Sequence, residues 1–140
     1  VNLDSATIDG LSYTVNWKPS ASELSLQLSG AWIKGEDEGG NVITDIPAHN
    51  HRLNVGYQVR NVRIFSDVLY RATKTEVADG ERALDKVVTV DIGASLPLNN
   101  KVNARVSIRN LTNQLFYVSA DERAAFAQGR SIQFALTMLL

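Results

Sequence analysis

The residues best suited to metal chemistry are two histidines two positions apart, His49 and His51, with Asp45 shortly before them. On a strand, a His-x-His pair places both imidazole rings on one face, and imidazole and carboxylate both bind zinc. A structural metal site normally needs four ligands, and the chain has 0 Cys to complete one. We therefore expect no metal, no cofactor and no enzymatic role, and interpret the histidines as solvated residues at the end of a loop.

No other grouping of residues suggests catalysis. The acidic run 36–38 precedes two glycines but lacks the spacing of oxygen ligands in a calcium-binding loop, so we interpret it as a flexible tip. Ser119 and Glu122 have the spacing of a capping box and Gly129 follows, which predicts one short helical turn between them.

Several stretches alternate apolar and polar residues, and arginines recur at their polar positions. Facing a wide polar interior, such arginines would pair with acidic groups or guide an anionic solute. Facing bulk water, they would form an ordinary hydrated surface. The candidates for lumen-facing residues are Arg52, Arg60, Arg63, Arg71, Arg105 and Arg109, which stand against Asp67 and Asp91.

The elements that position these side chains are strands. Apolar and polar residues alternate with period two from end to end, and no long helical pattern competes. This predicts an all-β fold, an antiparallel up-and-down meander of about seven strands. The alternating stretches are Leu11–Trp17, Leu24–Trp32, Leu53–Val59, Val62–Tyr70, Val88–Leu96, Val102–Ile108 and Ile132–Leu140.

Bulk composition leaves few function classes open. A chain of 140 residues with 44% hydrophobic residues is one domain's worth, and a net charge of −1 gives no electrostatic case for nucleic acid. No run of consecutive apolar residues is long enough for a transmembrane helix. A barrel strand crosses a bilayer with only about ten alternating residues, so spanning by strands stays open.

The connections between strands alternate in length. Those after the first, third and fifth strands are short, at 19–22, 60–61 and 97–100, whereas 34–51, 73–86 and 110–130 are long. In an antiparallel meander all short turns therefore lie at one rim and all long loops at the other. Outer-membrane barrels have this asymmetry, although a soluble sandwich can show it by chance.

Aromatic residues stand at strand ends within the apolar register. Trp17 is expected near the short turns, and Trp32 and Tyr70 near the long loops. Amphipathic aromatics at both ends of a lipid-facing surface form an interfacial girdle in membrane barrels. Packing in a soluble core is the commoner role of large aromatics and remains the alternative.

Four stretches resemble the C-terminal β-barrel segment of TonB-dependent outer-membrane receptors, and they follow the order of that family along nearly the whole chain. They are a strand ending in a Trp-Lys-Pro turn, an Ile-Pro-x-His start of a descending strand, an Asn-Leu-Thr-Asn segment, and a closing Gly-Arg before the last strand. In this sequence these are IDGLSYTVNWKPS (8–20), IPAHNHRLNVGYQ (46–58), VSIRNLTNQLFY (106–117) and GRSIQFALTMLL (129–140).

The resemblance implies part of an importer of about twenty-two strands in the bacterial cell outer membrane. Its implied partners are TonB, reached through a missing N-terminal region with the plug, outer-membrane lipid, and a small-molecule ligand of siderophore, cobalamin or glycan type. It also implies that the last strand is a signal to the barrel-assembly machinery. The residues of that strand are Phe134, Leu136, Met138 and Leu140.

Residues 1–140 are accordingly expected to be a fragment, the C-terminal part of a larger transmembrane β-barrel. An odd number of strands leaves the first and last parallel, so they cannot close an antiparallel cylinder, and the isolated fragment should self-associate through its open edges. The expected first strand is preceded by a bulge at Gly10. The alternatives are a soluble small-ligand-binding barrel or sandwich, and a small eight-stranded outer-membrane barrel with an extra strand from residues 1–9.

Overall fold

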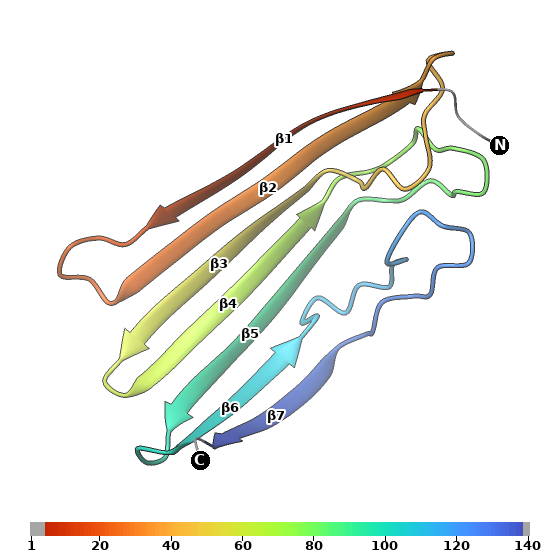
Figure 1. Ribbon diagram of the computed structural model, residues 1–140. Coiled ribbons are helices and arrows are strands. Elements are labelled where there is room, and N and C mark those ends of the chain that lie inside the picture. Colours follow the sequence, from red (N-terminus) through yellow and green to blue (C-terminus); the bar gives the residue numbers. More distant parts are fainter. Residues whose placement is uncertain (1–4, 139–140) are drawn as a thin grey trace.

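Residues 5–138 are described by a computed structural model, which is all-β (Figure 1). Seven strands form one antiparallel sheet whose spatial order is the order along the chain, so the predicted meander is confirmed. No helix in this part of the chain is long and apolar enough to cross a membrane. The strands are β1 (Ala6–Trp17), β2 (Leu24–Asp37), β3 (Asn50–Val59), β4 (Val62–Arg71), β5 (Val87–Pro97), β6 (Val102–Arg109) and β7 (Ser131–Met138).

The pairing of β1 with β2 is continuous. It runs from Ala6 opposite Asp37 to Trp17 opposite Leu26 without an inserted residue, so the expected bulge at Gly10 is wrong. A Cβ added at Gly10 would lie 3.0 Å from the carbonyl oxygen of Trp32, so the glycine serves a close backbone approach instead. Residues 6–9 belong to β1 and supply no eighth strand, and residues 1–4 lie outside the described part.

The connections lie at two opposite rims, as predicted from their lengths. We call the rim with the connections 18–23, 60–61 and 98–101 the short-turn rim, and the rim with 38–49, 72–86 and 110–130 the long-loop rim. In Figure 1 the short turns lie along the lower left of the sheet and the long loops at the upper right. Strand β2 extends three residues beyond the expected start of its loop at Lys34, which shortens the first long connection.

One face of the sheet is apolar from edge to edge. Directly opposed residues share a face, and the pairs Val15 with Leu28, Leu53 with Val68 and Val106 with Phe134 continue this belt across the strands. Nothing in residues 5–138 covers the belt: Phe134 is 80% exposed and Leu136 is 74% exposed. A soluble module would bury these residues in a dry centre, whereas in residues 5–138 they are exposed.

Buried apolar side chains among the described residues lie at the long-loop rim. They are Ala48, Leu84, Val87 and Ala120, and the partly buried Tyr117 packs against three of them. Within residues 5–138, the one small core therefore lies where the loops meet, and the apolar face of the strands stays largely uncovered.

The sheet does not close within residues 5–138. Strand β1 pairs with β2 alone and β7 pairs with β6 alone, and the two edge strands run in the same direction (Figure 1). Each edge therefore presents unpaired backbone N–H and C=O groups.

Candidate functional site, the polar hollow and the long loops

The second face of the sheet is polar and encloses an open hollow of about 930 Å³, which we call the polar hollow. Side chains of all seven strands line it, from Asn16 on β1 to Gln133 on β7. A single hollow that reaches both edge strands requires the sheet to curve around its polar face. The apolar belt is consequently on the outer, convex side.

The structure places the six candidate arginines in three settings. Arg52, Arg63, Arg105 and Arg109 line the polar hollow. Arg60 lies in the turn between β3 and β4, with a positive φ of 53°, and does not share the strand register assumed for it. Arg71 ends β4 at the long-loop rim and donates from Nη1 to the carbonyl oxygen of Tyr117 at 2.7 Å.

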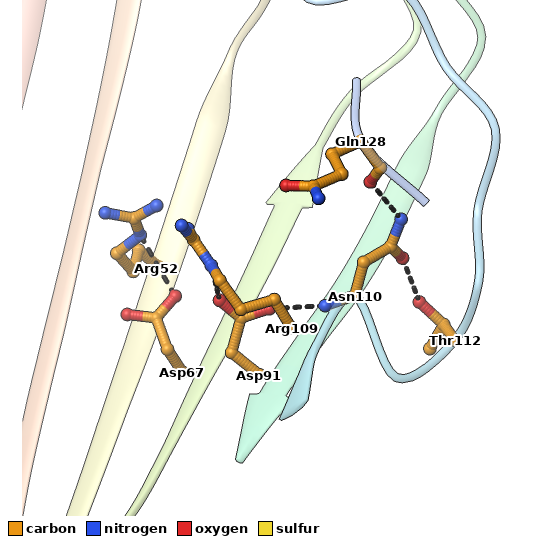
Figure 2. A network of polar contacts seen from close by, with 7 residues as sticks. All are labelled: Arg52, Asp67, Asp91, Arg109, Asn110, Thr112 and Gln128. Carbon is orange, nitrogen blue, oxygen red and sulfur yellow. Dashed lines mark hydrogen bonds and ion pairs between the residues drawn. The ribbon is translucent and has the colours of Figure 1, made fainter. Parts of the chain in front are cut away.

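Two ion pairs lie side by side in the hollow (Figure 2). The Nε atom of Arg52 is 3.2 Å from a carboxylate oxygen of Asp67, and Nε of Arg109 is 3.1 Å from one of Asp91. Asp67 and Asp91 are opposed across β4 and β5, which alone would be repulsive. Arg52 on β3 and Arg109 on β6 each neutralise one of the two aspartates, which offsets this repulsion.

Arg105 has an aromatic contact in place of an ion pair. Its guanidinium carbon lies 4.0 Å from the centroid of the Phe65 ring, a cation–π distance. The Phe65 ring in turn lies over Gly93, where an added Cβ would come within 2.3 Å of Phe65 Cζ. Within residues 5–138, neither Arg105 nor Arg63 has a carboxylate within 4.0 Å, so these cations are not neutralised by the described sheet.

Glu81 joins two of the long loops. One carboxylate oxygen accepts from Lys74 Nζ at 2.6 Å and from the backbone N–H of Ala78 at 3.2 Å, and the other accepts from the N–H of Asp45 at 2.8 Å. The side chains of Lys74 and Glu81 are only 8% and 5% exposed. Burial by itself raises the pKa of Glu81, but these donors outweigh it and hold the pKa below its ordinary value of 4.5.

The third long loop contains an aromatic stack, on which Arg82 of the second long loop packs. The rings of Tyr117 and Phe126 are 4.2 Å apart, and the guanidinium of Arg82 lies 3.9 Å over Tyr117. The Arg82 side chain also donates to the carbonyl oxygen of Glu122, and its backbone N–H donates to the carbonyl oxygen of Ala120 at 2.7 Å. The three long loops therefore form one packed unit.

The predicted short helical turn between Ser119 and Gly129 is wrong. Asp121 pairs with Glu81 in an isolated β-bridge, and Tyr117 pairs with Phe126 in another. The segment contains a hydrogen-bonded turn, in which the N–H of Ala124 donates to the carbonyl oxygen of Asp121 at 2.9 Å, but no helix, because the two bridges outweigh the local capping pattern.

Asn110 fastens both ends of the last loop to the sheet (Figure 2). Its buried side chain donates from Nδ2 to the carbonyl oxygens of Gln114 and Gln128 at 2.9 and 3.1 Å, and its Oδ1 accepts from Thr112 Oγ1 at 3.2 Å. Its backbone N–H donates to Asp91 at 2.8 Å. Asn110 and Asn113 both have positive φ, 47° and 52°, which asparagine tolerates better than most residues. These contacts and backbone angles explain why asparagine and threonine stand in the Asn-Leu-Thr-Asn segment.

The histidines lie among aromatic residues of the apolar belt. Nδ1 of His51 is 2.8 Å from the hydroxyl of Tyr13, and its ring stacks on Tyr70 at 6.0 Å. The His49 ring is 5.7 Å from Trp32. In residues 5–138 no group of three or more His, Cys, Asp or Glu side chains is placed to hold a metal ion.

The other residues singled out from the sequence are on the apolar face. Trp17 is exposed at the short-turn end of β1, and Trp32 and Tyr70 are exposed toward the long-loop rim. Phe134, Leu136 and Met138 are exposed on the edge strand β7, and Leu140 lies outside the described residues. Their interfacial and assembly roles stay predictions.

Sequence reasoning missed the residues that organise the loops. Glu81, Lys74 and Arg82 stand in a stretch with no periodic pattern, and their partners are distant in sequence. For Asn110 a signal did exist, because an asparagine directly after a strand is typical of a residue with positive φ.

Comparison with known proteins gives similarity in structure only. No family model matches the chain, and no curated protein matches its sequence. Among solved structures, the copper transporter OprC superposes with a TM-score of 0.85 over 95% of this chain, at 14% identity. The ferripyoverdine receptor of the outer membrane of Pseudomonas aeruginosa gives 0.74 at 13% identity, also over 95%. The FrpB iron transporter from Neisseria meningitidis gives 0.75 at 14% identity, again over 95%.

The chain is much shorter than these proteins. It spans 24% of the copper transporter, 19% of the ferripyoverdine receptor and 23% of the iron transporter. All three are TonB-dependent outer-membrane receptors, and the resemblance noted in the sequence is thereby confirmed for the fold. This chain has the fold of a seven-stranded segment of a TonB-dependent receptor barrel.

Proposed function

We propose that residues 1–140 are the C-terminal part of an outer-membrane receptor barrel that imports a scarce nutrient of siderophore, cobalamin or glycan type. In this proposal the apolar belt faces lipid, the polar hollow is part of the lumen lining, and the long-loop rim faces outward. The chain itself performs no chemistry. It supplies wall, lumen lining and outer loops.

The observation that carries the proposal is the exposure of the apolar belt on the convex face of all seven strands. Burying one fully exposed large apolar side chain is worth about 1.5–3 kcal/mol, so leaving such a continuous belt in water would be very unfavourable. Hydrocarbon on the convex side removes that cost, and the charged concave side stays in water.

The remaining barrel strands would pair with the open edges of β1 and β7. Energy from TonB would arrive through a segment outside this chain, and the exposed strand β7 would be read by the barrel-assembly machinery. Without the rest of the barrel, the isolated 140-residue fragment should self-associate through these edges. A stable monomer in size-exclusion chromatography of a refolded sample would contradict that part of the proposal.

Fractionation of cells that express the full-length protein tests the location. We expect the protein in the outer-membrane fraction of a density gradient, extractable only with detergent and with heat-modifiable migration on gels. A protein that remains monodisperse without detergent or lipid would favour a soluble binding module and overturn the proposal.

A further inference from the structure

Strand β2 is longer than its neighbour β3 at the long-loop rim. It continues to Asp37, whereas its pairing with β3 ends at Ala31 opposite Asn50 (Figure 1). Beside the part that β3 does not reach lies a cavity of about 260 Å³, which we call the wall cavity. It is lined by residues 32–35 of β2, by Val42 and residues 46–49 of the first long loop, and by residues 73–76 of the second. It shares no lining residue with the polar hollow.

Two aromatic rings line the wall cavity on the side of the apolar belt. Trp32 is the last apolar residue of β2 in the belt register, because the next residue in that register is the charged Lys34. The His49 ring lies 5.7 Å from the Trp32 ring, and both residues belong to the lining. Trp32 is 43% exposed, so part of its indole remains available to a ligand. The cavity therefore begins where the apolar belt ends.

Ile33 offers the wall cavity a backbone donor and a backbone acceptor. The N–H of Ile43 donates to the carbonyl oxygen of Gly35, so the backbone groups of Gly35 point toward the first long loop. Backbone direction alternates along a strand, and Ile33, two residues earlier, therefore points the same way. Among residues 5–138, no backbone hydrogen bond joins Ile33 to that loop. Its N–H and C=O groups can thus bind a polar ligand.

The charges around the wall cavity favour a neutral ligand over an anion. Nζ of Lys34 lies 2.6 Å from a carboxylate oxygen of Glu36. Lys74, the other lysine of the lining, is paired with Glu81, also at 2.6 Å. The exposed Glu76 adds a carboxylate to the lining. A phosphate or carboxylate would therefore meet lysines that are already paired, and a nearby negative charge.

We propose that the wall cavity binds one neutral sugar ring, supplied by a glycolipid headgroup or by a free glycan. A pyranose has an apolar C–H face and a rim of hydroxyl groups that both donate and accept. Trp32 would stack on the C–H face, because its indole combines a large apolar surface with a wet edge. The exposed hydroxyls of Thr73 and Thr75 and the backbone of Ile33 would bind the rim.

The size and the position of the wall cavity agree with this ligand. A volume of about 260 Å³ is just below the range of about 300–1,000 Å³ that is typical of drug-sized ligands, which suits a single ring. Amphipathic aromatic residues lie at the level of lipid headgroups in membrane proteins. The inference rests on the proposed function only in that the apolar belt is taken to face lipid, which places the cavity at that level.

Equilibrium dialysis of the full-length protein in phosphatidylcholine nanodiscs tests the site. The probes are the octyl and methyl glycosides of glucose, galactose and N-acetylglucosamine, and protein-free nanodiscs correct for partition into lipid. We expect saturable binding of at least one octyl glycoside. If the ring comes from a glycolipid, the methyl glycoside of the same sugar should bind at least about tenfold more weakly, because it lacks the chain that lies along the belt. Equal affinity of the two would assign the site to a free glycan.

Three variants locate the binding. Thr73→Val/Thr75→Val keeps the shape but removes two hydroxyls, and should lose about tenfold in affinity for the glycoside that binds. Trp32→Leu keeps an apolar residue but removes the stacking surface, and should also lose about tenfold. The matched control is Trp17→Leu, the same change at the short-turn rim and outside the lining of the wall cavity, which should change the affinity by less than about twofold. Heat-modifiable migration checks that each variant is folded.

Absence of saturable binding for all six glycosides would overturn the inference, as would equal losses in Trp32→Leu and Trp17→Leu. Either result in a protein found in the outer membrane would leave the proposed function intact. Binding of a methyl glycoside that depends on Trp32, by a protein that needs neither detergent nor lipid, would instead support the sugar site and refute the membrane role.

Discussion

Asp67 and Asp91 stand directly opposite each other on neighbouring strands, and each carboxylate is held by an arginine on its far side. The four charges form a row across the polar hollow in the order Arg52, Asp67, Asp91, Arg109. Two like charges at a cross-strand position are tolerated because the outer two neutralise them.

A double-mutant cycle on one ion pair should show this balance. Arg52→Gln leaves Asp67 facing Asp91 without its cation, so we expect a lower thermal midpoint for the full-length protein in detergent. Arg52→Gln/Asp67→Asn should recover part of the loss, with a coupling free energy of about 1 kcal/mol or less for this partly exposed pair. Additive effects in the cycle would show that the row does not act as a unit.

The docking of the long loops should weaken in acid because of Glu81. The folded pKa of Glu81 lies below its ordinary value of 4.5, so its contribution to stability is complete above that value. It is lost as the pH falls through the lower, folded pKa. We expect hydrogen exchange of the connections 38–49 and 72–86 to accelerate in that acidic range.

Two variants separate Glu81 from other acidic groups. Glu81→Gln leaves the buried ammonium of Lys74 without a charged partner and should cost about 3 kcal/mol in loop docking at neutral pH. Its loop exchange should lose the acidic step, whereas the exposed Glu76→Gln should keep it. An unchanged acidic step in Glu81→Gln would assign the effect to another group.

Asn110→Ala should release the last long loop from the sheet. The change removes a buried amide that serves both loop ends and leaves a positive φ of 47° on alanine, so we expect about 2–3 kcal/mol of local destabilisation. Limited proteolysis between residues 110 and 130 should become faster. Asn103→Ala, an exposed change on β6, the strand that precedes this loop, is the control, and equal cleavage in both variants would contradict the role given to Asn110.

Gly30 should be required for the contact between Tyr13 and His51. A Cβ at Gly30 would lie 2.5 Å from Nδ1 of His51 and 2.7 Å from Cε1 of Tyr13, so alanine must displace both rings. Tyr13→Phe removes only the hydrogen bond, worth about 0.5–1.5 kcal/mol. Gly30→Ala should therefore lower the thermal midpoint further.

The two changes at this contact should not be additive. In a Gly30→Ala background the hydrogen bond is already lost, so Tyr13→Phe should have almost no further effect. Equal effects of Tyr13→Phe in both backgrounds would show that the rings tolerate a methyl group between them.

The strands and their two rims were predictable because their signal is local. A period of two assigns each side chain to a face, and the alternation of loop lengths assigns each connection to a rim. The same local approach gave a helical turn at Ser119 and a strand position for Arg60. Both were wrong in detail because a distant bridge to Glu81 and a tight turn decided the backbone there.

Which charged side chains pair with one another could not be predicted from the sequence, for a related reason. Arg52 and Arg105 have the same residue type and the same register, yet one meets Asp67 and the other meets Phe65. The difference depends on the stagger between neighbouring strands, which fixes the residues that oppose one another. No pattern within a single strand contains that stagger.

The mutual docking of the three long loops restricts how this protein can be re-engineered. Transplanting the stretch 72–86 alone would leave Asp45 and Tyr117 facing a foreign partner. Recombination with a related barrel would have to exchange all three loops together to keep these contacts.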